Sequence, residues 1–314
     1  MKLSKNIYLL LKIVLGLLLL FFVFSRIGFN NIWQSLLTVN LLFIGLYILF
    51  KALSFLFNTL NIFILLHPYN HRIALKEMLH FTILSWSLGI FIPGKLGELS
   101  LSYFLKQREI PFTTSIAIFI LDRLISFIVL FILGFLSIIF LLPPIYGIYY
   151  SLFFVLFFIC FILLFFVNSL SDLLLKKIVK KYAAPVTILK KTLRDYIYNH
   201  PLLLLLNFIV TIIKWIYVAY CISLLFLAFD VIVPFLWIIS IQAVITFISL
   251  IPITFNGIGL NEPTGIFLYG LLGVPYATTA SLMAIALFLT LSIGGLFLLF
   301  FWNKKFTNSL FQEK

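Results

Sequence analysis

Long apolar runs alternate along the chain with short connections that carry most of the charges. Six runs are long enough for a helix to cross a hydrocarbon core, which needs about 20 residues. They cover 7–25, 41–66, 113–142, 146–167, 201–228 and 277–302. The first run follows Lys2 and Lys5 and is interpreted as a retained signal anchor, because the FSRIGFN stretch after it offers no small-residue cleavage site. The pattern predicts six full transmembrane helices.

The composition agrees with this pattern. Of the 314 residues, 64% are hydrophobic and 10% are charged, far more apolar than one soluble core requires. We therefore expect an all-α polytopic membrane protein with a single membrane domain over 1–314. Its predicted parts are a signal anchor with an outer loop (1–40), a first repeat (41–142), a connecting span with a basic cytoplasmic segment (143–200), a second repeat (201–302) and a cytoplasmic tail (303–314).

The net charge of +13 does not by itself indicate a nucleic-acid-binding protein. Most basic residues flank the apolar runs, where membrane orientation accounts for them. Cys160 and Cys221 both fall within apolar runs, where a thiol usually behaves as a small hydrophobic group. The four histidines show no metal-ligand spacing with cysteines or carboxylates. We expect no metal, no cofactor and no nucleic-acid partner.

Basic residues also predict the orientation in the membrane, because positively charged connections usually face the cytoplasm. The basic connections are 1–12, 67–76, 104–112, 168–200 and 303–314. The connections with one basic residue or none are 26–40, 143–145 and 229–231, and these should face outward. Both termini are then cytoplasmic, and the expected location is the cell membrane.

This orientation requires that 77–106 enters the membrane and returns to the same side. A single crossing there would place the basic segment 168–200 outside, against the orientation rule. Residues 77–92 and 94–106 are each too short to span, and Pro93-Gly94 is where a helix would break. We predict a re-entrant pair of half-helices that enters from the cytoplasm. A kinked transmembrane helix is the alternative.

A second break of the same kind is the sequence PITFNGIGLNE at 252–262. The stretch 232–274 around it is predicted to be a re-entrant hairpin that enters from outside. Aligning the two breaks pairs 41–142 with 201–302 as span, broken hairpin, span in opposite orientations. The predicted fold is thus six full transmembrane helices plus two re-entrant broken-helix hairpins in an inverted repeat. Such repeats are typical of transporters, with the binding site near the membrane midplane.

Polar residues at the breaks and within the spans are the candidates for substrate binding. A Gly-rich break at membrane depth needs protein or a water-filled cavity beside it, and a half-helix that begins there aims free N–H groups at an anion. The candidates are Lys51, Gly94, Lys95, Gly97, Glu98, Asp122, Arg123, Lys214, Asn256, Gly257, Gly259 and Glu262. Two simpler interpretations stay open: close helix packing for the glycines, and a tie between helices for Asp122-Arg123.

Three ordered motifs extend this picture: PGKLGELSLSYFLK at 93–106 followed by IP at 110–111, LDRL at 121–124, and LIPITFNGIGLNEPTGIFLYGLLGVP at 250–275. In this order the chain resembles the lysylphosphatidylglycerol synthase transmembrane-region family, also called flippase-like membrane proteins. The resemblance implies a multi-pass lipid-handling domain that, in the fused synthases, moves an aminoacylated lipid across the bilayer. Stand-alone members are also tied to polyprenyl-linked sugar pathways.

The chain departs from the family pattern at several points. Ser126 stands where family members often carry a second acidic residue, and Asn256 stands where many of them have glycine. The last span, 277–302, has no charged residue, whereas family members often carry an arginine there. The 314 residues contain no soluble aminoacyl-transfer domain. We therefore expect neither a lysylphosphatidylglycerol synthase nor another enzyme.

The leading hypothesis is a transporter-like lipid flippase that binds an anionic phospholipid or polyprenyl-phosphate-linked headgroup between the hairpins. The cations that would counter the phosphate are Lys51, Lys95, Arg123 and Lys214. The carboxylates that would orient these cations or bind a coupling proton are Glu98, Asp122 and Glu262.

Two other classes stay open. A small-solute or ion secondary transporter could use the same cavity without a lateral opening to lipid. A membrane glycosyltransferase, or its accessory protein, would require an acidic cluster on an outer loop. Asp230 is the only acidic residue in the predicted outer loops. A membrane lipid is the expected partner, and a lipid-modifying or glycosyltransferase protein is a second candidate. The oligomeric state does not follow from the sequence.

Overall fold

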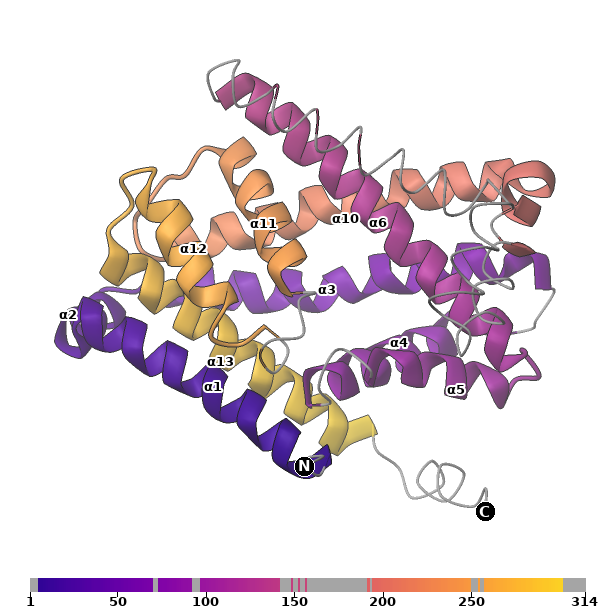
Figure 1. Cartoon of the computed structure of the whole chain (residues 1–314), viewed down its shortest axis with the longest axis horizontal. Coiled ribbons are helices and arrows are strands. Elements are labelled where there is room, and N and C mark those ends of the chain that lie inside the picture. The colour runs from indigo at the N-terminus through magenta and orange to yellow at the C-terminus, as the bar shows by residue number, and fades with distance from the viewer. Residues whose placement is uncertain are drawn as a thin grey trace. The chain divides into compact units, whose positions relative to one another are not determined.

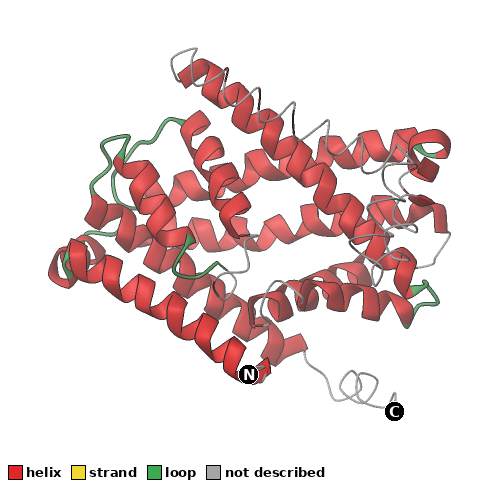
Figure 2. Ribbon diagram, viewed as in Figure 1, coloured by secondary structure: helices red, strands yellow, loops and turns green. Residues whose placement is uncertain are grey.

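A computed structural model of the chain describes residues 5–69, 73–91, 97–141, 148, 152, 156, 191–192, 194–249, 254 and 257–301. No strand occurs in these ranges, as Figures 1 and 2 show, so the all-α prediction is confirmed for them. The elements in chain order are α1 (Lys5–Ile27), α2 (Phe29–Leu37), α3 (Leu41–Leu66), the 3-10 helix η1 (His67–Tyr69), α4 (Leu75–Phe91), α5 (Ser100–Lys106), α6 (Phe112–Leu141), α10 (Pro201–Leu227), α11 (Phe235–Ser249), α12 (Asn261–Gly270) and α13 (Tyr276–Phe301).

Within the described ranges, four helices are long and apolar enough to cross a membrane by themselves. These stretches are Leu41–Tyr69, Phe112–Leu136, Pro201–Leu227 and Tyr276–Phe300. Counting the bent pair α1 and α2 as one span raises the number to five. The predicted span 146–167 falls almost entirely outside the described residues. The chain is therefore a polytopic helical membrane protein, and the total of six spans stays a prediction.

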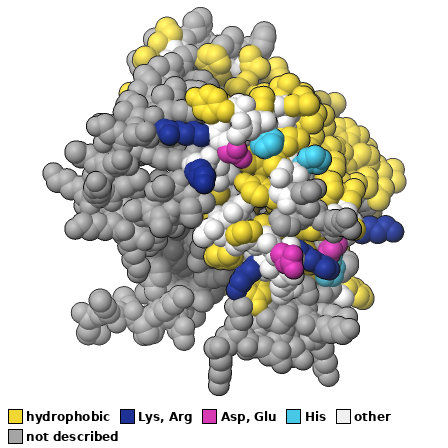
Figure 3. Space-filling view, turned by 90° about the vertical axis from the view of Figure 1, so that its right-hand side faces the viewer, with side chains coloured by type: hydrophobic (Ala, Val, Ile, Leu, Met, Phe, Trp, Pro, Cys, Tyr) yellow, Lys and Arg dark blue, Asp and Glu magenta, His cyan; other side chains and the backbone are white. Residues whose placement is uncertain are grey.

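The described surface is that of a membrane protein. Figure 3 shows one face on which hydrophobic side chains cover a broad area, while Lys, Arg, Asp, Glu and His side chains gather beside it. Large apolar side chains are exposed along most of the span helices, among them Leu18, Phe22, Leu202 and Phe288. Water-soluble monomers rarely expose apolar surface on this scale. The exposed surface of these helices is therefore suited to contact with lipid.

The connection between the first two apolar runs differs from the sequence interpretation. The stretch 26–40 was expected to be an outer loop, whereas residues Phe29–Leu37 form the helix α2. An isolated nine-residue helix is marginal in water. Here α2 is supported by tertiary packing, because Ile32 is buried against Ile266 and Ala280.

Internal contacts divide the chain into two compact units. Unit 1 comprises 1–55, 79–101 and 217–314, and unit 2 comprises 56–78 and 102–216. Within unit 1, α13 packs against α12 and α2, and α12 also contacts α11 and α1. The boundaries of the units do not coincide with the predicted repeats 41–142 and 201–302, which stay a prediction.

The first broken stretch turns back on itself. Ser85 Oγ in α4 donates a hydrogen bond to the carbonyl oxygen of Glu98 at 2.6 Å. Toward the other end of α4, Arg108 Nε donates to Glu77 Oε1 at 2.6 Å. A continuous helix would hold Glu77 and Arg108 about 45 Å apart. The chain therefore turns back between α4 and α5, and a re-entrant position of this turn in the membrane stays a prediction.

Gly97 allows the two arms of this hairpin to meet. A Cβ atom at residue 97 would overlap the Leu88 carbonyl group, so we expect Gly97→Ala to destabilise the protein by about 1–3 kcal/mol, the usual cost of overpacking. Gly45→Ala in α3 is the matched control, because nothing lies within 4 Å of the added methyl group. Equal thermal unfolding of the two variants in detergent would contradict the close contact.

The two hairpins end with the same local geometry. Glu109 after α5 and Gly273 after α12 both adopt left-handed backbone conformations, with φ of 64° and 82°. The next residue in each case, Ile110 or Val274, donates its N–H back to the preceding helix at 3.2 Å, as in a Schellman-type helix end. A proline then leads into α6 or α13. The same helix end also follows α10, where Asp230 has a φ of 56° and Val231 donates to Phe226 at 3.1 Å, so this helix end is a common local structure.

Candidate functional site

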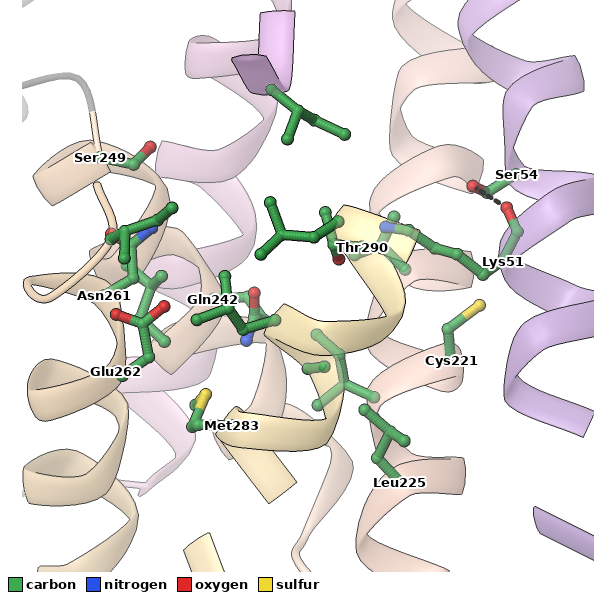
Figure 4. A pocket seen from close by; sticks show the side chains of 18 of the residues that line it. Lys51, Ser54, Cys221, Leu225, Gln242, Ser249, Asn261, Glu262, Met283 and Thr290 are labelled. Atoms are coloured by element: carbon green, nitrogen blue, oxygen red, sulfur yellow. Dashed lines mark hydrogen bonds between the residues drawn. The ribbon is translucent and has the colours of Figure 1, made fainter. Parts of the chain in front are cut away.

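A cavity of about 360 Å³ lies within unit 1. Its walls come from α3, α4, α10, α11, α12 and α13, together with residues beside the two breaks. The polar residues that line it are Tyr47, Lys51, Ser54, Trp86, Glu98, Gln242, Ser249, Asn261, Glu262 and Thr290. Figure 4 shows labelled polar side chains around this space among apolar ones such as Leu225 and Met283. A mixed lining of this size is typical of small-ligand sites.

Both broken stretches border this cavity. Glu98 follows the first break, and Ile258, Asn261 and Glu262 belong to the second. The two stretches are far apart in sequence, so the fold of unit 1 brings them to a common space. This arrangement is the one that a binding site between two broken hairpins requires.

Charged groups face one another across the cavity. Among the described lining residues these are Lys51, Glu98 and Glu262. In Figure 4 the Lys51 side chain extends into the space from α3, whereas Asn261 and Glu262 lie on the opposite wall. No described residue forms a hydrogen bond or ion pair with Lys51 Nζ, although the Lys51 carbonyl oxygen accepts a bond from Ser54 Oγ at 2.6 Å. The cavity thus contains an ammonium group that a ligand can pair with.

The second break is built from two glycines and a buried carboxylate. Gly257 and Gly259 have φ of 78° and 81°, in the left-handed region that side chains other than glycine rarely adopt. The Gly259 N–H donates to Glu262 Oε2 at 2.7 Å, and Glu262 itself is buried. One carboxylate oxygen of Glu262 therefore stabilises the break, which places Glu262 as a positioning residue at the cavity wall.

Helix α1 supports the second break through a close backbone contact. A Cβ atom on Gly16 would lie 2.7 Å from the Ile258 carbonyl oxygen, and a Cβ atom on Gly259 would overlap the Gly16 carbonyl. Ile258 lines the cavity. The small residue in α1 therefore helps to fix the position of the cavity wall.

A family model matches almost the whole chain. The model described as "Lysylphosphatidylglycerol synthase TM region" covers residues 9–304. The chain belongs to this family. The resemblance carried by its three motifs is thereby confirmed. A search of curated proteins and a search of solved structures find no match.

Six predicted site residues lie at the cavity or in the broken stretches beside it. Lys51, Glu98 and Glu262 line the cavity, and Gly257 and Gly259 shape the break beside it. Gly97 holds the first hairpin closed next to Glu98. The predicted residues Gly94, Lys95 and Asn256 lie outside the described residues, so their roles stay predictions.

Three charged residues that were predicted to bind substrate belong to unit 2 and do not line the cavity of unit 1. Lys214 is buried and its Nζ donates to Ser126 Oγ at 3.1 Å. The Arg123 guanidinium carbon lies 4.9 Å from the centroid of the Phe119 ring. Asp122 is 3% exposed, and its Oδ1 has no hydrogen-bond partner among the residues that the structure describes. Their part in substrate binding stays a prediction.

The sequence analysis did not select several residues that line the cavity. Gln242 carried a usable signal, because an amide in the mostly apolar stretch Phe235–Ser249 is a large polar group among hydrophobic residues. Asn261 lies inside the second motif, next to residues that were chosen. Trp86 offered no comparable signal, since aromatic residues make up 18% of the chain. Its place in the wall follows only from how α4 packs.

Proposed function

We propose that the protein is a transporter-like lipid flippase whose unit 1 cavity binds a phosphate-bearing lipid headgroup. The observation that carries this proposal is a cavity bordered by both broken stretches and containing the Lys51 ammonium without a partner among the described residues. An ammonium group binds phosphate as a point charge. The acyl or polyprenyl tails would stay in the bilayer while the headgroup passes through the cavity.

The membrane architecture belongs to the same proposal. Six full spans with two re-entrant hairpins in an inverted repeat would place the cavity near the bilayer midplane. The turn-back at Ser85 and Glu98 supports this arrangement. In the proposed orientation both termini face the cytoplasm and the first hairpin enters from that side.

The headgroup class follows from the charges. A phospholipid and a polyprenyl-phosphate-linked lipid both present the phosphate that Lys51 would bind, and Lys95 would add a second cation. Glu98 and Glu262 would orient the cations or take up a coupling proton. No bond-making step is proposed, so the protein would move its ligand and not transform it. Lipid-modifying or glycosyltransferase proteins would be its partners.

A small-solute transporter is the second candidate, and one observation favours it. The described lining residues include one lysine and two glutamates, a balance that also suits a zwitterionic solute. A membrane glycosyltransferase accessory protein gains no specific support from the cavity. Lipid movement and solute uptake therefore need to be compared in the same preparation.

The test uses the purified full chain in phosphatidylcholine vesicles. Acyl-labelled phosphatidylglycerol on the inner leaflet should become accessible to a membrane-impermeant reductant faster than in protein-free vesicles, and acyl-labelled phosphatidylcholine should move more slowly. An anionic lipid should also co-purify with the protein in a mass-spectrometric analysis. Unchanged movement of both labelled lipids, together with uptake of an amino acid, would replace the flippase proposal with the solute transporter.

A further inference from the structure

Helix α2 leaves the line of the first span at a sharp bend. The two helices meet at 81°, and the bend occurs at Gly28, whose φ is 94°. Asn31 Nδ2 fixes it by donating to the Ile27 carbonyl oxygen at 2.9 Å. With 23 residues, α1 is about 35 Å long, which reaches the length that a crossing needs, whereas the nine residues of α2 extend only about 14 Å. The helix is too short to be a second crossing.

One face of α2 is occupied by the protein itself. Ile32 is buried against Ile266 of α12 and Ala280 of α13, and Leu36 packs beside it. Ser281 Oγ in α13 donates to the Ile32 carbonyl oxygen at 3.1 Å. These contacts fix how α2 is rotated about its own axis.

With that rotation fixed, the remaining surface of α2 divides into two edges. Phe29, Trp33 and Leu37 recur every fourth residue and form an apolar edge, with exposed fractions of 52%, 59% and 63%. At about 100° per residue, the exposed amides of Asn30 and Gln34 form a separate polar edge. A helix at the surface of a soluble protein would need only the protein face and the polar edge. The apolar edge therefore requires an environment other than the protein interior and water.

The apolar edge of α2 continues an exposed surface that the span helices provide. Phe21 and Phe22 near the end of α1 are exposed, and so are Leu41 and Leu42 at the start of α3. Since α3 is long and apolar enough to cross a membrane and α1 belongs to the fifth candidate span, the lipid around them is also beside α2. Tryptophan prefers the boundary between headgroups and acyl chains, and Trp33 lies in the middle of the edge.

We propose that α2 is an interfacial helix that lies along the membrane surface. Its Phe29–Trp33–Leu37 edge enters the acyl-chain boundary of the leaflet and its amide edge faces water. The protein face connects this anchor to the cavity, because Met283 packs against the Ile32 cluster and also lines the cavity. The bilayer interface thereby holds the α13 wall of the cavity at a set depth. This inference does not depend on the proposed transport function.

The test compares two adjacent positions. Trp33→Cys and Gln34→Cys are made in the full chain with Cys160 and Cys221 replaced by alanine, spin-labelled, and reconstituted in vesicles of three parts phosphatidylcholine to one part phosphatidylglycerol. The label at 33 should collide several-fold more with oxygen than with a water-soluble nickel chelate, and the label at 34 should show the reverse. Phe29→Cys and Asn30→Cys form a second pair on the same two edges, about 100° apart on the helix.

A native-residue measurement covers the case in which labelling disturbs α2. Brominated lipid should quench tryptophan fluorescence less in Trp33→Phe than in the unmodified protein, because the interfacial tryptophan is gone. Equal nickel accessibility at 33 and 34, with no difference in quenching, would place α2 in water and overturn the proposal. Lipid exposure at both 33 and 34 would overturn it as well, since α2 would then continue the first span inside the bilayer.

Discussion

Gly259→Ala should destabilise the protein by about 2–5 kcal/mol, the largest stability loss expected from a single methyl group in this chain. Two costs combine at this position. The φ of 81° is strained for any residue with a Cβ atom, and the added methyl would overlap the Gly16 carbonyl of α1. Because Gly259 also donates its N–H to Glu262, displacement of the break should distort the cavity wall.

Gly273→Ala separates these two costs. Gly273 has a φ of 82° but nothing lies within 4 Å of its added methyl, so only the backbone strain of about 1–3 kcal/mol should appear. Thermal unfolding of both variants in the same detergent, followed by fluorescence and size-exclusion chromatography, gives the comparison. If Gly259→Ala were no less stable than Gly273→Ala, the packing of α1 on the second break would be disproved.

Lys51→Met should reduce binding and movement of the anionic lipid by about 10- to 100-fold, because a hydrogen bond to a charged group contributes about 1.5–3 kcal/mol. Folding should be preserved. A charge at the centre of a membrane helix costs about 2.5–3.5 kcal/mol on insertion scales, so the uncharged side chain relieves a cost in the empty protein. Lys51→Arg should retain part of the activity, since it keeps the charge and changes only the donor geometry.

The control for Lys51 is a lysine outside the cavity. Lys76→Met removes the same charge from an exposed position in α4 and should leave lipid movement at the level of the unmodified protein. The measurement is the vesicle assay with labelled phosphatidylglycerol, applied to monodisperse samples of each variant. Full activity in Lys51→Met would remove the headgroup from this cavity.

Four of the six predicted span helices match described helices almost to the residue. The expected runs 41–66, 113–142, 201–228 and 277–302 differ from α3, α6, α10 and α13 by at most one residue at either end. The reason is physical: a hydrocarbon core of fixed thickness sets the length of an apolar helix, and length is a property of the chain alone. The described helices α4 and α11 end at Phe91 and Ser249, next to the stretches where the sequence predicts breaks on equally local grounds.

Short and packed features were beyond the sequence. The helix α2 is stable only because Ile32 has a partner surface on α12 and α13, and the importance of Gly16 follows only from its contact with Ile258 and Gly259. In both cases the contacting residues are more than 200 positions apart in the sequence. Close backbone contacts of this kind leave no pattern in the chain apart from an isolated small residue, which is common in membrane helices for many reasons.

The sequence by itself determined which charged residues lie within long apolar runs, and only the tertiary structure decided which of them share a cavity. Lys51 and Lys214 each lie in the interior of a long apolar helix, α3 and α10, yet Lys51 lines the unit 1 cavity and Lys214 is buried against Ser126 in unit 2. Depth follows from position along an apolar run. The direction in which a side chain points depends on how each helix is rotated by the packing of its neighbours, and that rotation is set by contacts between distant segments.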